Sequence, residues 1–398
     1  MSLAGTAALL FAAAALASTL LCAGMKRFAP LVGLVDKPGG RKAHKAPTPL
    51  GGGVAFAAAL GLVLLAGWLV LAHMPGLLPP EVARYADGLR SRWPELLGIL
   101  GLSTLMMIMG LIDDRFGLPW QPRLVVQTLA AVGLVCLGVR ATLFPPFSNV
   151  AFSGAVTVLW VVAMTNAFNF LDNMDGLAAS VALIAALLFA GAQALAGSLF
   201  VPALLVVLAG SLAGFLAHNR PPARLFMGDA GSNFLGFFLA AMTVAGTFTR
   251  PYDREHPTSP YSVLTPLLVM AVPIYDMISV ILIRIREGRS PFQADRRHFS
   301  HRLVERGLTP PRAVATMDFI TLVAGFGALL LHQPWLSAFD AALVVGQTAC
   351  LLIIVAILEG TTIAPAPATR QGPADGQGPS PDPPAASPIG IEPPADGP

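Results

Sequence analysis

Residues 153–176 read SGAVTVLWVVAMTNAFNFLDNMDG. The first eighteen carry no charged side chain, and the run ends close to Asp172 and Asp175. An uncharged apolar run of this length is typical of a helix that crosses the hydrocarbon of a bilayer. Carboxylates are costly beside lipid, so acids at the end of such a helix indicate a functional site. The stretch therefore predicts a membrane-spanning helix with polar chemistry at one end.

The same arrangement recurs three times, because other polar motifs also stand where apolar runs end. They are Gly110-Leu-Ile-Asp113-Asp114, Met227-Gly228-Asp229-Ala-Gly231-Ser232 and the basic stretch Ala294-Asp295-Arg-Arg-His298-Phe-Ser-His301-Arg302. Four such motifs in one chain favour a shared site over four unrelated polar helix ends.

The composition supports a membrane protein independently of the motifs. Of the 398 residues, 55% are hydrophobic and 12% are charged, against about 25% charged in an ordinary soluble domain. We predict an all-α polytopic membrane protein with about 11 transmembrane helices and cytoplasmic catalytic loops. The expected spans are 2–24, 51–73, 96–112, 124–139, 153–170, 177–196, 199–217, 231–249, 262–283, 313–331 and 336–358.

Basic residues accumulate in cytoplasmic loops, so their distribution predicts the orientation. With the N-terminus outside, eighteen of the 25 Lys and Arg residues fall in cytoplasmic loops and six in the opposite loops. This topology brings all four motifs and the C-terminus to the cytoplasmic side of a cell inner (plasma) membrane. Lys26 and Arg27 follow the first apolar run rather than precede it, which favours an uncleaved span over a secretory signal.

Two domains are expected. Residues 1–360 form the membrane domain, and residues 361–398 form a disordered Pro-rich cytoplasmic tail, because eleven of the 35 prolines fall there. Cys22, Cys136 and Cys350 lie within expected spans at no ligand spacing, and they indicate neither a disulfide framework nor a thiolate metal site.

The acids suit a magnesium–phosphate site. Mg2+ prefers oxygen ligands and is usually held by one or two carboxylates while substrate phosphates complete its coordination. The adjacent Asp113 and Asp114 repel each other unless a cation compensates. Together with Asp172, Asp175 and Asp229 they fit such a site; the alternative is that each acid merely caps a helix or pairs with an Arg.

Glycines and basic residues accompany the acids. Gly51–Gly53 and the glycines beside Asp175 and Asp229 suit either close approach of backbone to phosphate or close packing of helices. Lys42 and His44 in one basic loop, and His298, His301 and Arg302 in another, supply countercharge, phosphate contacts or proton transfer.

Taken in order from about residue 26 to 310, these motifs resemble the polyprenyl-phosphate N-acetylhexosamine-1-phosphate transferases. The resemblance rests on the stretch Asp36–Gly52, Asp113-Asp114, Asn166 to Asp175, Gly228–Ser232 and Ala294–Leu303. It implies transfer of a sugar 1-phosphate from a UDP-amino sugar to undecaprenyl phosphate or a related lipid phosphate, with release of UMP, as a first membrane step of cell-envelope glycan synthesis.

The resemblance also implies the roles of individual residues. Asn169 and Asp229 would coordinate Mg2+, with Mn2+ as an alternative ion. Asp113 and Asp114 would be the catalytic pair that deprotonates the acceptor or organises its attack. The substrate-binding residues would be Lys42, His44, Thr48, Arg123, Asp172, Asp175, His298, His301 and Arg302. Direct attack and a two-step route through an aspartyl phosphate both remain open.

Two positions depart from the family's motifs. Ser300 stands where the N-acetylglucosamine branch has a histidine, and Asn173 stands where glycine is common. The loop also lacks the consecutive histidines of the MurNAc-pentapeptide branch, so we favour an N-acetylglucosamine-like donor with the other branch as the alternative. A secondary transporter is a remote alternative, because transporters bind their substrates near the midplane rather than at one face. The expected partners are the UDP-sugar, the lipid phosphate and the bilayer, with no nucleic acid; a homodimer is compatible with the sequence.

Overall fold

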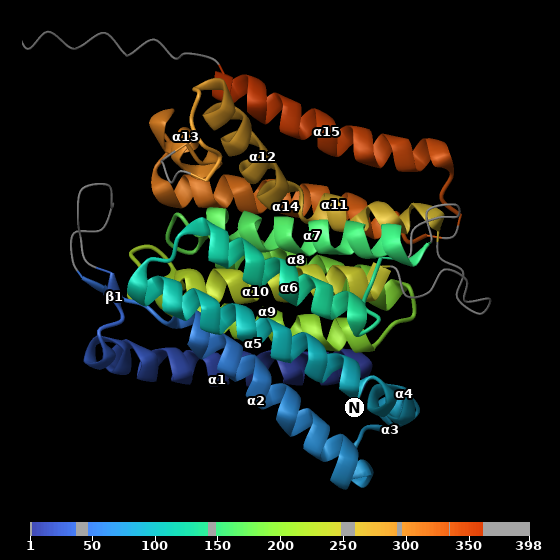
Figure 1. Ribbon diagram of the computed structural model, residues 1–398. Coiled ribbons are helices and arrows are strands. Elements are labelled where there is room, and N and C mark those ends of the chain that lie inside the picture. Colours follow the sequence, from blue (N-terminus) through green and yellow to red (C-terminus); the bar gives the residue numbers. More distant parts are fainter. Residues whose placement is uncertain are drawn as a thin grey trace, which may run out of the picture. The chain divides into compact units, whose positions relative to one another are not determined.

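The chain is helical almost throughout the part that is described, as the ribbon diagram shows (Figure 1). The computed structural model describes residues 2–36, 47–141, 149–247, 259–292, 297–333 and 335–360. The long helices are α1 (Leu3–Phe28), α2 (Gly52–His73), α5 (Trp93–Phe116), α6 (Trp120–Cys136), α7 (Val150–Leu171), α8 (Leu177–Leu195), α9 (Phe200–Asn219), α10 (Gly228–Thr247), α12 (Ala271–Arg286), α14 (Pro310–Leu330) and α15 (Ala338–Gly360). The short elements are η1 (Ala29–Val32), β1 (Val35–Asp36), β2 (Thr48–Pro49), η2 (Pro75–Leu77), α3 (Pro80–Ala83), α4 (Ala86–Ser91), η3 (Pro260–Leu264), α11 (Thr265–Val269) and α13 (Phe299–Glu305).

Each range that the sequence predicted as a span contains a helix or a pair of helices. Within the described residues, eight helices are long and apolar enough to cross a membrane, and a ninth span results if one bent pair is counted. Helix α6, with 17 residues, and the 20-residue α10 are not among them. An all-α multi-pass membrane protein is thus confirmed, whereas the number eleven stays a prediction.

The expected span 262–283 is not one continuous helix. Residues Pro260–Val269 and Ala271–Arg286 are bent by 62° relative to each other, with the break at Met270. Pro273 explains the break, because its nitrogen has no hydrogen to donate to Val269 and its ring crowds that carbonyl.

Helix α10 lies in the centre of the bundle and is buried along most of its length. Its closest contacts with α5 and α2 depend on glycines. A Cβ at Gly110 would lie 2.2 Å from the carbonyl oxygen of Asp229, and a Cβ at Gly53 would lie 2.1 Å from the Cα of Gly231. The glycines of the Gly51–Gly53 and Gly228–Gly231 motifs that meet here therefore serve helix packing, which brings three helix ends into one place.

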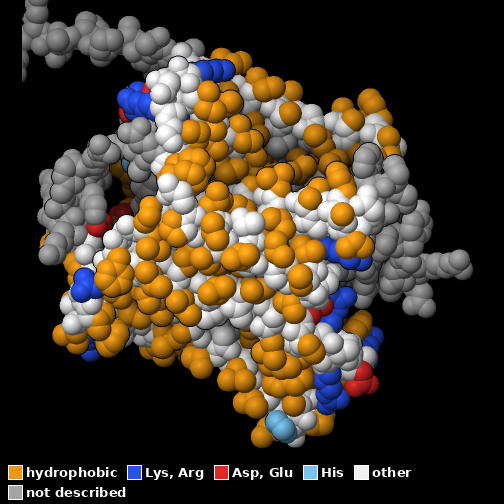
Figure 2. Space-filling view, in the orientation of Figure 1, with side chains coloured by type: hydrophobic (Ala, Val, Ile, Leu, Met, Phe, Trp, Pro, Cys, Tyr) orange, Lys and Arg blue, Asp and Glu red, His pale blue; other side chains and the backbone are white. Residues whose placement is uncertain are grey.

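The surface of residues 1–360, which form one compact unit, matches a membrane environment. Figure 2 shows hydrophobic side chains along the middle of the helices and charged side chains toward their two ends. The large exposed side chains include Leu16, Leu62, Leu159 and Phe326, which lie on four different helices. The predicted disordered tail, 361–398, lies outside the described residues.

Candidate active site

The acidic motifs meet where α5 and α7 end and α10 begins. Asp113 and Asp114 belong to the last turn of α5, Asn169 belongs to the last turn of α7, and Asp229 is the second residue of α10. The close packing at Gly110 fixes the end of α5 directly against this start of α10. The sequence therefore predicted correctly that these residues come together.

Asp113 is held by a basic residue of the next helix. Its Oδ2 accepts a hydrogen bond from Nη1 of Arg123, and its Oδ1 accepts one from the backbone N–H of Leu118 at 2.7 Å. The same Arg123 nitrogen lies 3.7 Å from Oδ2 of Asp229. Arg123 thus stands between two carboxylates, and it neutralises part of the repulsion within the cluster.

Asp114 instead caps the start of α10. Its carboxylate accepts hydrogen bonds from the backbone N–H groups of Asp229 at 2.8 Å and Ala230 at 3.1 Å. These amides form the positive end of the helix dipole, so they stabilise the charge of Asp114. The two adjacent acids therefore have different surroundings: Asp113 faces an arginine, and Asp114 faces a helix N-terminus.

Asn169 and Asp229 form the proposed metal pair. The side-chain amide of Asn169 donates to Oδ1 of Asp229 at 2.7 Å and to Oγ of Ser232 at 3.0 Å. In the described part of the chain, no three His, Cys, Asp or Glu side chains are grouped closely enough to hold a metal by themselves. An ion with one carboxylate, one amide oxygen, water and substrate phosphate needs no such group, so the donor set fits Mg2+.

A row of amide side chains continues from Asp229 toward α6. Asn233 donates to the backbone oxygen of Asp229 at 2.8 Å and accepts from Nε2 of Gln127 at 3.1 Å. Oε1 of Gln127 accepts from Asn166 at 2.7 Å. Sequence reasoning quoted Asn166 only as part of a motif and missed Gln127 and Asn233; polar residues within expected spans were the signal that could have found them.

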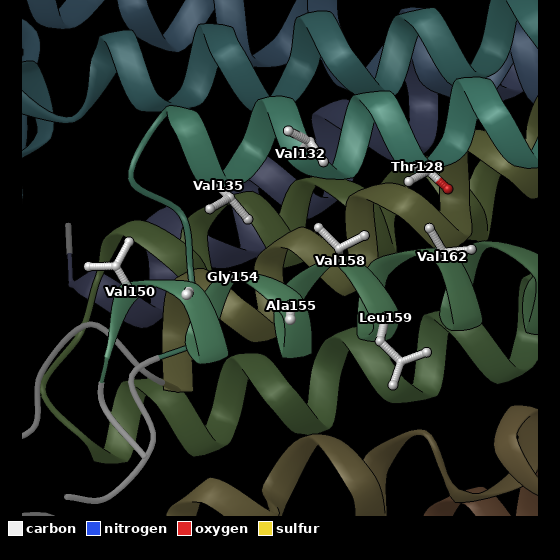
Figure 3. Close-up of a pocket in the computed structure, with 10 residues that line it drawn as sticks. Thr128, Val132, Val135, Val150, Gly154, Ala155, Val158, Leu159 and Val162 are labelled. Atoms are coloured by element: carbon white, nitrogen blue, oxygen red, sulfur yellow. The ribbon is translucent and has the colours of Figure 1, made fainter. Parts of the chain in front are cut away.

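An apolar groove begins next to this row. Asn166 also donates to the carbonyl of Val162, and Val162 and Thr128 line the groove's near end. The groove has a volume of about 620 Å3 and lies between α6 and α7 (Figure 3). Its other lining residues are Val132, Val135, Val150, Ala151, Gly154, Ala155, Val158 and Leu159.

Residues 172–176, here called the acidic turn, join α7 to α8. Oδ2 of Asp175 accepts from the backbone N–H of Ala223 at 2.9 Å, and the N–H of Gly176 donates to Oδ1 of Asn219 at 3.0 Å. Burial, reinforced by the negative charges of Asp114 and Asp175, raises the pKa of Asp172 to about 7. Asp172 therefore changes its charge near neutral pH.

The end of the basic motif, from Phe299 to Arg302, lies in the short helix α13, and the start of this helix is anchored by an acid that sequence reasoning missed. Asp276 of α12 is fully buried; its Oδ2 lies 3.0 Å from Nδ1 of His298, and its Oδ1 accepts from the N–H of Phe299 at 2.6 Å. The ring of His301 lies 6.4 Å from that of His298. An acid inside an expected span was a sufficient signal for Asp276.

Arg302 is bound by residues of α12 and α15, which lie outside the acidic motifs. Its Nη2 lies 3.0 Å from a carboxylate oxygen of Glu359 at the end of α15 and 2.8 Å from Oγ of Ser279. The contact of Arg302 with substrate stays a prediction, and the contacts seen here favour a role in holding α13 in place. Arg284 of α12 is also buried, and its guanidinium lies 5.2 Å from the ring centroid of Phe170.

The remaining predicted substrate residues come from the first basic loop. Lys42 and His44 lie outside the described residues. Thr48 is in β2, where it pairs with Asp36 of β1. The next residue, Pro49, accepts a hydrogen bond from the N–H of Phe226 at 2.9 Å, so β2 adjoins the segment that leads into α10.

Comparisons with known proteins point to one family. The sequence profile of Glycosyl transferase family 4 matches residues 96–247, which contain the α5, α7 and α10 motifs. The decaprenyl-phosphate N-acetylglucosaminephosphotransferase of Mycobacterium tuberculosis is 34% identical over 328 residues, covering 76% of this chain and 77% of that protein. The undecaprenyl-phosphate alpha-N-acetylglucosaminyl 1-phosphate transferase of Escherichia coli is 30% identical over 330 residues, covering 78% and 80%. A protein named as the probable transferase of the same kind from Bacillus subtilis is 28% identical over 323 residues, covering 79% and 82%. The chain therefore belongs to the polyprenyl-phosphate N-acetylhexosamine-1-phosphate transferase family.

Proposed function

We propose that this protein transfers N-acetylglucosamine 1-phosphate from a UDP-sugar to undecaprenyl phosphate or a related polyprenyl phosphate and releases UMP. The observation that carries the proposal is the meeting of Asp113, Asp114, Asn169 and Asp229 at one end of the bundle, beside an apolar groove. Such a site offers charge for phosphates and an apolar surface for a lipid in adjoining places. The names of the relatives support the same donor and acceptor.

Phosphoryl transfer requires mainly positioning and neutralisation of negative charge. Asp229 and an oxygen of Asn169 would hold Mg2+, which when bound neutralises charge on the donor diphosphate. Arg123, already between Asp113 and Asp229, contributes a fixed positive charge that also suits the acceptor phosphate. His298 and His301, at the start of α13, would contact the donor. The buried Asp276 accepts a hydrogen bond from Nδ1 of His298, which keeps the proton on Nδ1 and leaves Nε2 for the substrate.

Asp114 is the better candidate for assisting the attack. Asp113 is paired with Arg123, whereas the charge of Asp114 is supported by backbone amides. Asp114 would take the proton of the acceptor phosphate or orient its oxygen, and Asp113 would hold Arg123.

The membrane arrangement is part of the proposal. We propose eleven spans with the N-terminus outside and a cytoplasmic site in the inner (plasma) membrane. The distribution of basic residues supports this arrangement, because it brings eighteen Lys and Arg residues to the cytoplasmic side. UDP-sugars are water-soluble and reach such a site without crossing the bilayer.

The groove between α6 and α7 would take the polyprenyl chain. Its lining is apolar, and its near end adjoins the amide row that leads to Asp229. We expect Ala155→Phe, which fills the groove from an exposed position, to raise the KM for undecaprenyl phosphate about tenfold, because about 1.4 kcal/mol of apolar contact is lost.

The control for the groove is Ala12→Phe, the same change at an exposed position of α1. It should leave the KM for undecaprenyl phosphate unchanged, and Ala155→Phe should leave the KM for a short-chain acceptor unchanged. Equal effects of both variants on the long acceptor would rule out the groove as the lipid site.

The pKa of Asp172 predicts a pH dependence. Because that pKa is raised to about 7, Asp172 is protonated below pH 7 and ionised above it. If the ionised form binds the donor, kcat/KM for the donor should rise with pH between about 6 and 8. Asp172→Asn should lower kcat/KM and remove this rise; a profile that keeps the same rise in the variant would assign it to another group.

The proposed function is tested by UMP release from purified protein in detergent. With undecaprenyl phosphate and Mg2+, UDP-N-acetylglucosamine should release UMP, and UDP-MurNAc-pentapeptide should not. EDTA or omission of the lipid should stop the release. Release of UMP that needs neither the lipid nor the ion would contradict the proposal. Release from UDP-MurNAc-pentapeptide alone would assign the chain to the MurNAc-pentapeptide branch of the family.

A further inference from the structure

One hydrogen bond joins the acidic turn to the basic helix α13. Oγ of Ser300 donates to Oδ1 of Asn173 at 2.5 Å, and Ser300 is fully buried. The amide nitrogen of Asn173 in turn donates to the backbone oxygen of Phe170 at 2.6 Å, which fixes the orientation of the side chain. The two residues are 127 positions apart, so the contact is created by the tertiary fold.

The bond lies between the groups that would contact the donor. Asn173 stands between Asp172 and Asp175 on the acidic turn, and Ser300 stands between His298 and His301 on α13. Neither Asn173 nor Ser300 is charged. The neighbouring acids and histidines can contact the donor even if these two residues do not. The bond therefore links the middle of one proposed binding segment to the middle of the other.

Each segment is also anchored independently of this bond. The acidic turn is held through Asp175 to Ala223 and through Gly176 to Asn219. The start of α13 is held by Asp276. Loss of the Asn173–Ser300 bond should therefore leave both segments folded and change mainly how they lie relative to each other.

We propose that Asn173 and Ser300 are positioning residues that set the separation between the acidic turn and the two histidines, and so determine how the UDP-sugar is bound. This proposal rests on the proposed function, because it assigns the two segments to the donor. The acceptor site should be affected less. Asp113 pairs with Arg123 of α6, and Asp114 accepts from the backbone amides at the start of α10, so these contacts involve neither Asn173 nor Ser300.

The test is a double-mutant cycle with Ser300→Ala, Asn173→Ala and both together. Each single variant should raise the KM for UDP-N-acetylglucosamine about five- to tenfold, which is the usual effect of one buried hydrogen bond. The KM for undecaprenyl phosphate should stay within about twofold. The double variant should be no worse than the more impaired single variant, because the bond between the two residues is already lost in each single variant.

The matched control is Ser180→Ala. Ser180 follows the acidic turn on α8 and donates a half-buried hydrogen bond to Asp318 of α14 at 2.7 Å; among the described residues, its hydrogen bonds do not reach α13. It should lower the melting temperature in detergent about as much as Ser300→Ala does, without changing the donor KM. This comparison separates a general loss of stability from a change in donor position.

The outcomes distinguish this inference from the proposed function. A wild-type enzyme that transfers the sugar phosphate, with a donor KM that neither single variant changes, overturns the positioning role alone. Effects of the single variants that add in the double variant also overturn it, because the residues then act separately. A folded wild-type protein that uses no UDP-sugar overturns the proposed function and this inference with it.

Discussion

Asp114→Asn is expected to lower the rate of transfer by about a hundred- to ten-thousandfold, the range for loss of a group that moves a proton. Asparagine has nearly the same shape as aspartate, but it has no negative charge and only one oxygen. It can therefore accept from one of the two N–H groups of Asp229 and Ala230, and it directs an amide nitrogen at the other. Turnover of purified protein, measured as UMP release, checks the expectation.

Asp87→Asn is the matched control for this change. Asp87 belongs to α4, pairs with Arg90 at 3.2 Å and has a side chain that is 98% exposed. It should leave turnover unchanged. If the Asp114→Asn protein elutes as a folded species and turns over at the normal rate, Asp114 has no role in the reaction.

Asp276→Asn is expected to lower kcat by about a hundred- to ten-thousandfold with a smaller change in KM. The asparagine oxygen can still accept from the N–H of Phe299, so the start of α13 should remain formed. The amide nitrogen then faces Nδ1 of His298, which can no longer donate there. His298 must change its tautomer or rotate, so Nε2 no longer presents the same group to the substrate.

Asp318→Asn is the control for the loss of an acid from a membrane-spanning helix; Asp318 is half-buried. Asp318 lies on α14 and accepts from Ser180. It should affect the melting temperature more than kcat, while Asp276→Asn should do the reverse. Equal losses of kcat in the two variants would show that Asp276 serves the fold and does not orient His298.

The centre of the site could be predicted from the sequence because each acid stands at the end of an apolar run. Helices that cross one membrane in alternate directions bring such ends to the same face, so the meeting of Asp113, Asp114, Asn169 and Asp229 follows from span positions and orientation. The different surroundings of Asp113 and Asp114 could not be predicted from the sequence. Arg123 lies beside Asp113 and the start of α10 lies beside Asp114 only because of how the three helices pack.

Other features depended on contacts between distant segments. Arg302 was expected at the substrate because it belongs to a basic motif, but Glu359, 57 residues later, holds it in the structure. Asp276 had no nearby motif, and its partner His298 lies 22 residues away beyond the end of α12. The glycines were compatible with phosphate binding or packing, and only the approach of Gly53 to Gly231 decided between them for that pair.

The most direct test of sugar-phosphate transfer follows the β-phosphorus of the donor. Purified protein in detergent is given undecaprenyl phosphate, Mg2+ and UDP-N-acetylglucosamine labelled at the β-phosphorus. The label should move into the lipid in proportion to the UMP released, and the Asp114→Asn protein should move it at least about a hundredfold more slowly. Label that stays with UDP, or that appears in water-soluble sugar phosphate while the lipid remains unlabelled, would contradict the account.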